Sequence, residues 1–329
     1  MENISMIGTQ FILVGLAELA DVKYLSFLVL AIYIVVMALC SLIVFVTWTE
    51  ETLHEPMYIF IANLMLADMY GSTAIMPKLI IDLMTGCVTI SFTGCLAQGF
   101  FLQTFPGAEI FTFTAMAYDR YLAVGHPLRY PMLMNNKRAF NILVGIWIYV
   151  YVGICAIVVI ASRQTLCGVR INSVFCETIS LTHLSCGNNT LGIVFGFTWT
   201  MLMIVGCVCV VVYCYIRTFL VCLKISQEAC EKAIHTLVTH IIAFFTFLAS
   251  SLFTVFRYRI KGESLTFLSH LITSIAGLAS FTLNPVIYGI RTEALRTKMS
   301  QRLKSMKSFI WTWTRKQTDQ YLQRHKCGR

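Results

Sequence analysis

Charged side chains are scarce in this chain, and several patterns of soluble proteins are missing with them. Only 12% of the 329 residues are Asp, Glu, Lys or Arg, about half the share in an average soluble domain, and 57% are hydrophobic. Several runs of 20 or more residues carry almost no charge, which predicts multiple membrane helices and not one large soluble core. The short alternating segments of a transmembrane barrel are missing as well.

Further absences exclude whole classes of function. The thirteen Cys show neither CxxC…CxxC nor paired Cys/His spacing, so we expect no zinc site. A nucleophile–base cluster is missing, which argues against an enzyme. Internal repeats and paired broken helices, which would indicate a transporter, are missing too. The opening MENISMIGTQF has neither a basic stretch nor a small-residue cleavage site, so the first span should be an uncleaved insertion signal.

What the chain does contain is seven long apolar segments. They predict an all-α membrane protein, a seven-transmembrane helix bundle, with residues 1–23 before it and a tail over 291–329 after it. We expect the membrane domain to cover 24–290. The expected spans are 24–48, 57–83, 92–124, 139–161, 191–222, 232–256 and 264–290.

The distribution of basic residues predicts the orientation of the bundle. Because seven spans place the termini on opposite sides, Lys and Arg in the loops decide which side is which. The tail side holds 18 of the 25, and the other side holds seven. We therefore expect an extracellular N-terminus and a cytoplasmic C-terminus in the cell membrane. The tail carries the net charge of +9 and begins with an amphipathic pattern, so it should lie on anionic lipids as a short amphipathic helix and not bind nucleic acid.

The stretch EIFTFTAMAYDRYLAVGHPLRY ends the third span with Asp119, Arg120 and Tyr121. A charged pair is tolerated at a bilayer edge, where water and headgroups hydrate it, but would be costly at the centre. The triplet therefore indicates the cytoplasmic end of the span. It is also a candidate contact for a partner on that side, although two charges at a helix end are also ordinary interfacial residues.

Two acids lie at membrane depth. Asp68 is in the second span and Glu109 in the third. Facing each other, they would share a proton or hold a cation such as sodium, because sodium prefers hard oxygen ligands. Asn284 of the seventh span could add an oxygen, and Asn284-Pro285 is a candidate hinge. In the alternative interpretation, each acid is protonated and bonds a neighbouring backbone.

The expected outer side carries a proline notch, several cysteines and two glycosylation patterns. Pro106-Gly107 should kink the third span and open space for a ligand, or else form a packing notch. Cys95, Cys167, Cys176 and Cys186 allow three pairings, and disulfides there would hold the long loop 163–189 as a lid. The glycosylation acceptor patterns are at Asn3 and Asn188.

These motifs together resemble a rhodopsin-like G-protein-coupled receptor, and more narrowly an odorant (olfactory) receptor, over residues 24–305. The sequence HEPMYIFIANL suggests the fish-type branch. The stretches that carry the resemblance are PMYIF from Pro56, MAYDRY from Met116, HPLRY from His126, KA…T…H from Lys232 and NPVIY from Asn284.

The resemblance implies partners and roles. The chain would bind a small odorant and activate a heterotrimeric G protein of the stimulatory olfactory type, which raises cAMP. Asp68 and Glu109 would form an internal sodium site, with no other cofactor. The implied disulfides are Cys95–Cys176 and Cys167–Cys186. The implied coupling residues are Asp119, Arg120, Tyr121, Tyr215, His240, Asn284, Pro285 and Tyr288, and the ligand contacts by helical position are Gln103, Gly107, Trp199, Met203, Leu248, Ser251, Leu252, Val255 and Ser274.

Among the alternative receptor types, two usually need a residue that this chain lacks. A retinal receptor needs a Lys in the seventh span, and residues 264–290 contain none; an amine receptor usually has an acid in the outer third span, and 92–108 contain none. A related receptor for a peptide or lipid is the main alternative. Cys40-Ser41 stands where the family usually has Gly-Asn, so the polar link between the first, second and seventh spans should differ here.

Overall fold

The computed structural model describes residues 10–17, 24–171, 173–187, 189–257, 279, 281–304, 311–313 and 315. The glycosylation patterns at Asn3 and Asn188 and the expected ligand contact Ser274 lie outside the described residues.

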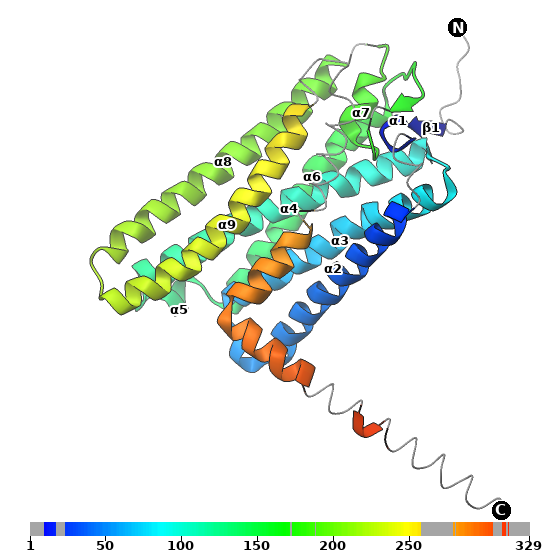
Figure 1. The fold of residues 1–329 in the computed structure, drawn as a ribbon. Coiled ribbons are helices and arrows are strands. Elements are labelled where there is room, and N and C mark those ends of the chain that lie inside the picture. Colours follow the sequence, from blue (N-terminus) through cyan, green and yellow to red (C-terminus); the bar gives the residue numbers. More distant parts are fainter. Residues whose placement is uncertain are drawn as a thin grey trace, which may run out of the picture.

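Long helices lying side by side form the molecule (Figure 1). The first five expected spans agree with helices whose ends differ from the prediction by three residues at most. The sixth helix begins at Gln227, five residues before the expected start. Its first turns, QEACEK, are polar but favour helix, so the helix extends beyond the apolar run that marked the span. The long helices are α2 (Tyr24–Thr49), α3 (Pro56–Thr85), α4 (Phe92–Gly125), α6 (Asn136–Ser162), α8 (Thr190–Cys222) and α9 (Gln227–Arg257).

Two longer helical stretches follow α9 in the described part of the chain. Residues 281–291 belong to the expected seventh span, and 293–304 form the helix expected after it. The second lies at an angle to the first, at the end of the bundle (Figure 1).

Short elements occupy the two ends of the bundle (Figure 1). At one end, here called the sheet end, a small sheet not predicted from the sequence has the strand order β2-β1-β3, with β1 antiparallel to β2 and parallel to β3. At the other end, the α5 end, lie α5 and the α8–α9 connection. The short elements are β1 (Gln10–Leu13), α1 (Val14–Ala17), η2 (Glu51–Leu53), β2 (Thr89–Ser91), α5 (Tyr130–Leu133), β3 (Arg170–Ile171) and α7 (Thr178–His183).

Helix α4 is the central element. It contacts α3, α6, α8 and α9. Five described helices (α2, α3, α6, α8 and α9) are long and apolar enough to cross a membrane, whereas α4 is less apolar. A central helix needs less apolar character because neighbouring helices, and not lipid, cover most of its surface.

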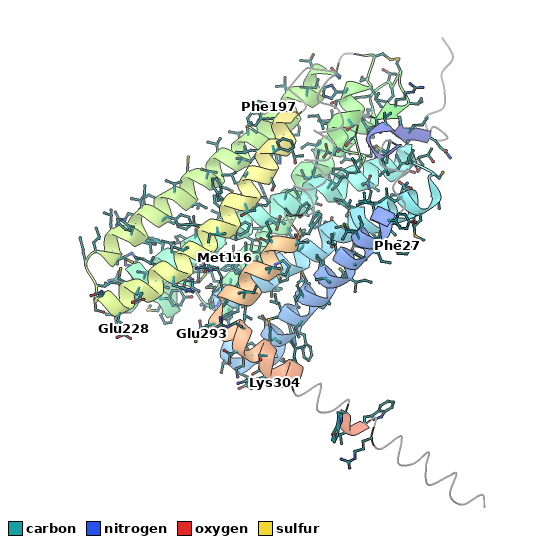
Figure 2. The ribbon with its side chains drawn as sticks, viewed as in Figure 1. Phe27, Met116, Phe197, Glu228, Glu293 and Lys304 are labelled. Atoms are coloured by element: carbon teal, nitrogen blue, oxygen red, sulfur yellow. A yellow bond between two sulfur atoms is a disulfide. The ribbon has the colours of Figure 1, made fainter. Side chains whose placement is uncertain are left out.

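The outer surface of the bundle is apolar and its charges gather at the α5 end. Phe27 on α2 is 64% exposed, while Met116 on α4 is buried. Figure 2 shows these two positions, with Glu228, Glu293 and Lys304 toward the α5 end. Exposed apolar side chains along long helices are what a lipid-facing surface requires.

Candidate ligand cavity and signalling end

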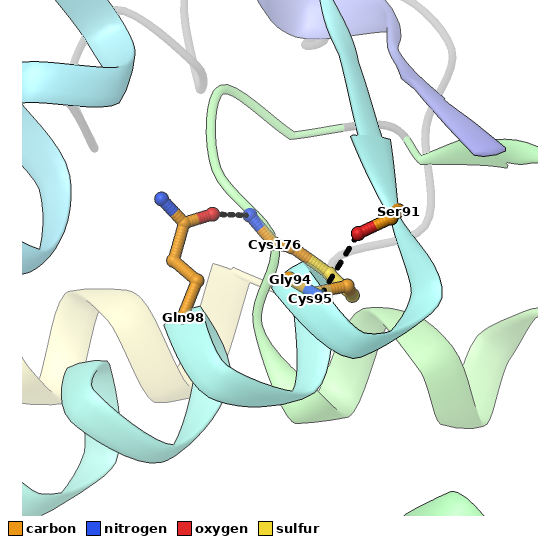
Figure 3. The surroundings of a disulfide bond; sticks show 5 residues. All are labelled: Ser91, Gly94, Cys95, Gln98 and Cys176. Atoms are coloured by element: carbon orange, nitrogen blue, oxygen red, sulfur yellow. Dashed lines mark hydrogen bonds between the residues drawn. A yellow bond between two sulfur atoms is a disulfide. The ribbon is translucent and has the colours of Figure 1, made fainter. Parts of the chain in front are cut away.

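The long loop before α8 is fastened over the sheet end. Cys95 on α4 is bonded to Cys176, and Cys167 to Cys186, which are the two pairs that the family resemblance implies. Beside the first disulfide, Oε1 of Gln98 accepts a hydrogen bond of 2.9 Å from the backbone N–H of Cys176, as Figure 3 shows. The Gln98 amide also donates to the Ala74 carbonyl on α3. Gln98 was not predicted from the sequence, because an isolated Gln in an apolar helix has no distinctive spacing.

The N-terminal strand also supports this loop. Alternation along β1 buries Phe11 and Leu13 and leaves Gln10 and Ile12 exposed. The Ile12 N–H donates to the Val169 carbonyl at 2.8 Å. The strand therefore joins the two connections that precede α4 and α8.

A cavity of about 550 Å³ lies beneath the loop. Its wall comes from α3, α4, α6, α8, α9 and the 281–291 helix, and loop residues 175–183 roof it. Most of the wall is apolar, with Phe105, Phe247 and Phe281 among its aromatic side chains. A roofed, mainly apolar cavity of this size with a few polar groups suits a small organic molecule.

A buried polar cluster lies deeper on α4. Nδ2 of Asn284 donates to Oδ1 of Asp68 at 3.1 Å and to Oε1 of Glu109 at 2.6 Å, and all three residues are buried. The second oxygen of each acid, Oδ2 of Asp68 and Oε2 of Glu109, has no hydrogen-bond partner among the described residues. The amide presents its nitrogen, and not the expected oxygen, to the acids.

A second buried cluster joins α3, α4 and α6 by hydrogen bonds. Asn63 donates to Thr112 at 2.9 Å and accepts from the indole N–H of Trp147 at 2.9 Å. These side chains fix the positions of three helices along the centre of the bundle.

At the α5 end, Asp119 is fully buried and its Oδ1 accepts a hydrogen bond of 2.8 Å from the Tyr130 hydroxyl of α5. Arg120 is half-buried, and its Nε has no hydrogen-bond partner within the described ranges. Tyr121 contacts His126 of the connection to α5 at 3.3 Å. The triplet therefore holds the α4–α5 connection against the bundle.

Helices α8 and α9 are joined at the same depth by a hydrogen bond between the Tyr215 hydroxyl and Nδ1 of His240. His240 is buried and its ring meets the edge of Phe113 on α4. Tyr288 is also buried, and its hydroxyl lacks a partner in the described structure. Arg291 donates to Thr239 at 3.1 Å, which links the last helix of the bundle to α9.

Comparison with known proteins assigns the family. The sequence model described as "Olfactory receptor" matches residues 29–306. The chain belongs to the olfactory receptor family. Human olfactory receptor 6N1 is 32% identical over 298 residues, which cover 90% of this chain and 95% of that protein. Mouse olfactory receptor 6E1 is 29% identical over 310 residues, which cover 92% and 98%.

The fold of the receptor is also found in a solved structure. The crystal structure of squid rhodopsin matches with a TM-score of 0.69 and 18% identity, covering 86% of this chain and 80% of that chain. The family and the fold together show that this chain is an odorant-sensing receptor of the rhodopsin-like G-protein-coupled class. It is a multi-pass protein of the plasma membrane and not an enzyme. Assignment to the fish-type branch stays a prediction.

Five of the expected ligand contacts line the cavity of the receptor and three do not. Trp199 packs instead on α6, where a Cβ built on Gly153 would lie 2.1 Å from its ring. Leu248 and Leu252 pack against the hydrophobic core, because their face of α9 turns away from the cavity. The five that line it are Gln103, Gly107, Met203, Ser251 and Val255.

The roof of the cavity was missed at the residue level. Glu177, Thr178 and His183 line it in the segment that follows the disulfide-bonded Cys176. A lid was expected from the cysteines, but the short helix α7 (Thr178–His183) was not predicted, so the directions of its side chains could not be inferred. Pro106-Gly107 was expected either to open space for a ligand or to form a packing notch. Gly107 does both, because it lines the cavity and a Cβ there would lie 2.9 Å from Val150 on α6.

In the first span, the residues that stand in place of the family's Gly-Asn pair lie in different surroundings. Ser41 is exposed and directs its hydroxyl to the sulfur of Met69 at 3.9 Å. Cys40 is fully buried and packs in the hydrophobic core. Of this pair, Cys40 is therefore the residue inside the bundle, and Ser41 is on its surface.

Proposed function

We propose that the receptor binds a small odorant in the cavity and activates a heterotrimeric G protein of the stimulatory olfactory type at the α5 end, raising cAMP. The observation that carries the proposal is the position of α4. This one helix forms a wall of the lidded cavity with Gln103 and Gly107, and carries Asp119 and Arg120 near its other end.

A continuous path of aromatic contacts connects the two regions. Phe247 lines the cavity, and its ring centroid lies 5.5 Å from that of Phe113. Phe113 meets His240 at 5.6 Å, and His240 is hydrogen bonded to Tyr215. A ligand that moves Phe247 would thus disturb the pair joining α8 to α9. Tyr288 and the Asn284-Pro285 hinge would adjust in the same step and open a site beside Arg120.

The proposed orientation follows from the loop charges. The sheet end, with both disulfides, would face outside, and the α5 end would face the cytoplasm. Residues 1–23 would then be extracellular, 24–290 the membrane domain and 291–329 the cytoplasmic tail. Helix 293–304 would contact membrane lipids through its apolar side.

An internal sodium ion fits the acid pair. Two carboxyl groups in one buried site repel each other unless a proton or a cation lies between them. The partnerless oxygens of Asp68 and Glu109 are hard ligands of the kind sodium prefers. When bound, the ion would supply positive charge between the acids, and Asn284 would hold their other oxygens in place.

Replacing Arg120 with Ala tests the proposed function. We expect the Arg120→Ala variant to reach the cell surface and to lose ligand-dependent cAMP, because Arg120 lies at the proposed G-protein contact. Arg129→Ala, which changes an exposed arginine of the adjoining connection, is the matched control and should keep its response. Full signalling by Arg120→Ala would contradict the assignment.

A receptor for a peptide or lipid is the second candidate. The roof over the cavity favours a small molecule over a peptide, since a cavity of about 550 Å³ holds a drug-sized compound. A cAMP screen divided between water-soluble acids and volatile apolar compounds would distinguish ligand classes.

A further inference from the structure

Polar groups of the cavity differ in what they can offer a ligand. A hydroxyl has a single hydrogen to donate. Thr200 donates its own to the Gly196 carbonyl at 2.9 Å, and Ser250 donates to the Thr246 carbonyl at 3.0 Å. Two more wall hydroxyls, those of Thr182 and Thr254, are also committed to backbone carbonyls, at 2.6 and 3.0 Å. These four oxygens can therefore only accept hydrogen bonds from a ligand.

Gln103 adds a stronger acceptor. It lines the cavity, and its Oε1 is buried with no partner among the described residues. Burying an amide oxygen without a hydrogen bond costs free energy, which a donating ligand would recover.

A second buried oxygen lies one helical turn away. Residues four apart in a helix share a face, so Gly99 and Gln103 are neighbours on α4. A Cβ built on Gly99 would lie 2.8 Å from Oγ1 of Thr178, which also has no partner in the described chain. These two buried oxygens without a described partner therefore lie on the side of the cavity where α4 meets the roof.

Fixed charge in the wall selects against anions. Among the described residues that line the cavity there is no Lys or Arg; the ionisable ones are Glu177 and His183. Transferring a carboxylate from water into such a site is costly because no Lys or Arg compensates its charge.

We propose that the odorant is a mainly apolar alcohol, whose hydroxyl donates to Oε1 of Gln103 beneath the Thr178 side of the lid. This inference rests on the proposed function and specifies the ligand of the same site. The remainder of the molecule would occupy the apolar wall around Phe105, Phe247 and Phe281.

The test uses the full receptor in cells with a cAMP reporter. Linear and cyclic compounds of five to ten carbons are supplied as matched sets in which only the functional group changes: alcohol, aldehyde, amine and carboxylic acid. We expect alcohols to be more potent than the matched aldehydes by about 3- to 10-fold, the range of one neutral hydrogen bond, and acids to be inactive.

Gln103→Leu removes the acceptor at similar size and should abolish the difference between alcohol and aldehyde. Gln103→Glu keeps an acceptor oxygen, so it should retain the response to alcohols and gain one to amines. Gln164→Leu is the matched control, because Oε1 of Gln164 is also buried without a described partner but Gln164 does not line the cavity. Surface expression is measured for each variant.

The outcomes separate the two proposals. Equal or greater potency of acids, aldehydes or amines in the unmodified receptor would overturn the alcohol assignment alone, and so would an unchanged preference in Gln103→Leu. If every compound left cAMP at the level of Arg120→Ala, the proposed odorant receptor function would fail together with this inference.

Discussion

A hydrogen bond from Tyr130 holds Asp119, the first residue of the triplet, to the α4–α5 connection. Asp119 is buried, and the Tyr130 hydroxyl donates to one of its oxygens at 2.8 Å. The other oxygen, Oδ2, has no partner in the described part of the chain. Without the Tyr130 hydroxyl, neither oxygen of this buried carboxyl group would have a hydrogen-bond partner among the described residues. That loss would raise the free energy of the conformation seen here.

Tyr130→Phe should therefore raise basal cAMP. A hydrogen bond to an ionised group contributes about 1.5–3 kcal/mol, so its loss would shift the balance of receptor states by about tenfold or more. Tyr118→Phe is the control, because that side chain is on the exposed surface next to the triplet. Basal signalling that is the same in both variants and the parent would exclude a restraining role for this bond.

At the scale of helices, close approach decides which sequence changes are tolerated. On α6, the Cα of Gly153 faces the ring of Trp199 on α8, and an added Cβ would lie 2.1 Å from that ring. The indole also stacks on Tyr149, at 5.0 Å between ring centroids, so its freedom to move aside is limited.

Gly153→Ala should lower the thermal stability of the purified receptor by about 1–3 kcal/mol, the range for an overpacked interior. Gly145→Ala, two turns earlier on the same helix, is the matched control, because a Cβ there meets nothing within 4 Å. Thermal unfolding in detergent measures both. A Gly153→Ala receptor as stable as the Gly145→Ala receptor would show that α6 and α8 can separate without cost.

The helix over 293–304 is held by charge. Glu50, after the end of α2, forms ion pairs with Lys298 at 3.0 Å and Arg302 at 2.6 Å. The hydrogen bonds from Lys298 and Arg302 lower the pKa of Glu50 below its ordinary value. A lowered pKa means that the attachment is present at neutral pH and is lost only as the pH falls through the lowered value.

Glu50→Gln should loosen this helix at neutral pH, observed as greater mobility of a spin label at Ser300. In the parent protein, the same loosening should occur only when the pH falls below the ordinary titration range of a Glu carboxyl, because the pKa of Glu50 is lowered. Glu51→Gln changes the adjacent exposed acid and should have no effect. Equal mobility in the two variants would contradict attachment through Glu50.

The positions of the helices were easier to predict from the sequence than the side chains that line the cavity. The apolar runs predicted the ends of the first five spans, because each helix must be long enough to cross the lipid bilayer. The start of α9 at Gln227 was not predicted, because helix propensity and not hydropathy sets it. Trp199, Leu248 and Leu252 were expected at the cavity but do not line it. Position along a helix predicts which way a side chain points only when the rotation of the helix about its axis is known. Glu177 and Thr178 could not be predicted, because the path of the connection between α6 and α8 does not follow from hydrophobic periodicity.

At the scale of the whole receptor, two covalent links fasten the lid, and they should not be equivalent. Cys95–Cys176 joins the loop to the central helix and closes 81 residues of chain, whereas Cys167–Cys186 closes 19 within the loop. In the loop-entropy view, the longer closure constrains the unfolded chain more. It also holds the residues that line the cavity immediately after Cys176.

Cys95→Ser and Cys176→Ser should therefore each cause the same loss of surface expression and odorant response, and the double variant should be no worse than either alone, because the bond is lost once. Cys167→Ser with Cys186→Ser should cause a smaller loss that adds to the first. Cys87→Ser, at an exposed cysteine of the same end that forms no disulfide, controls for the substitution itself. Flow cytometry of an N-terminal tag together with the cAMP reporter measures the set. A double Cys95/Cys176 variant clearly worse than its single variants would mean that each thiol acts separately, and the lid would then need another anchor.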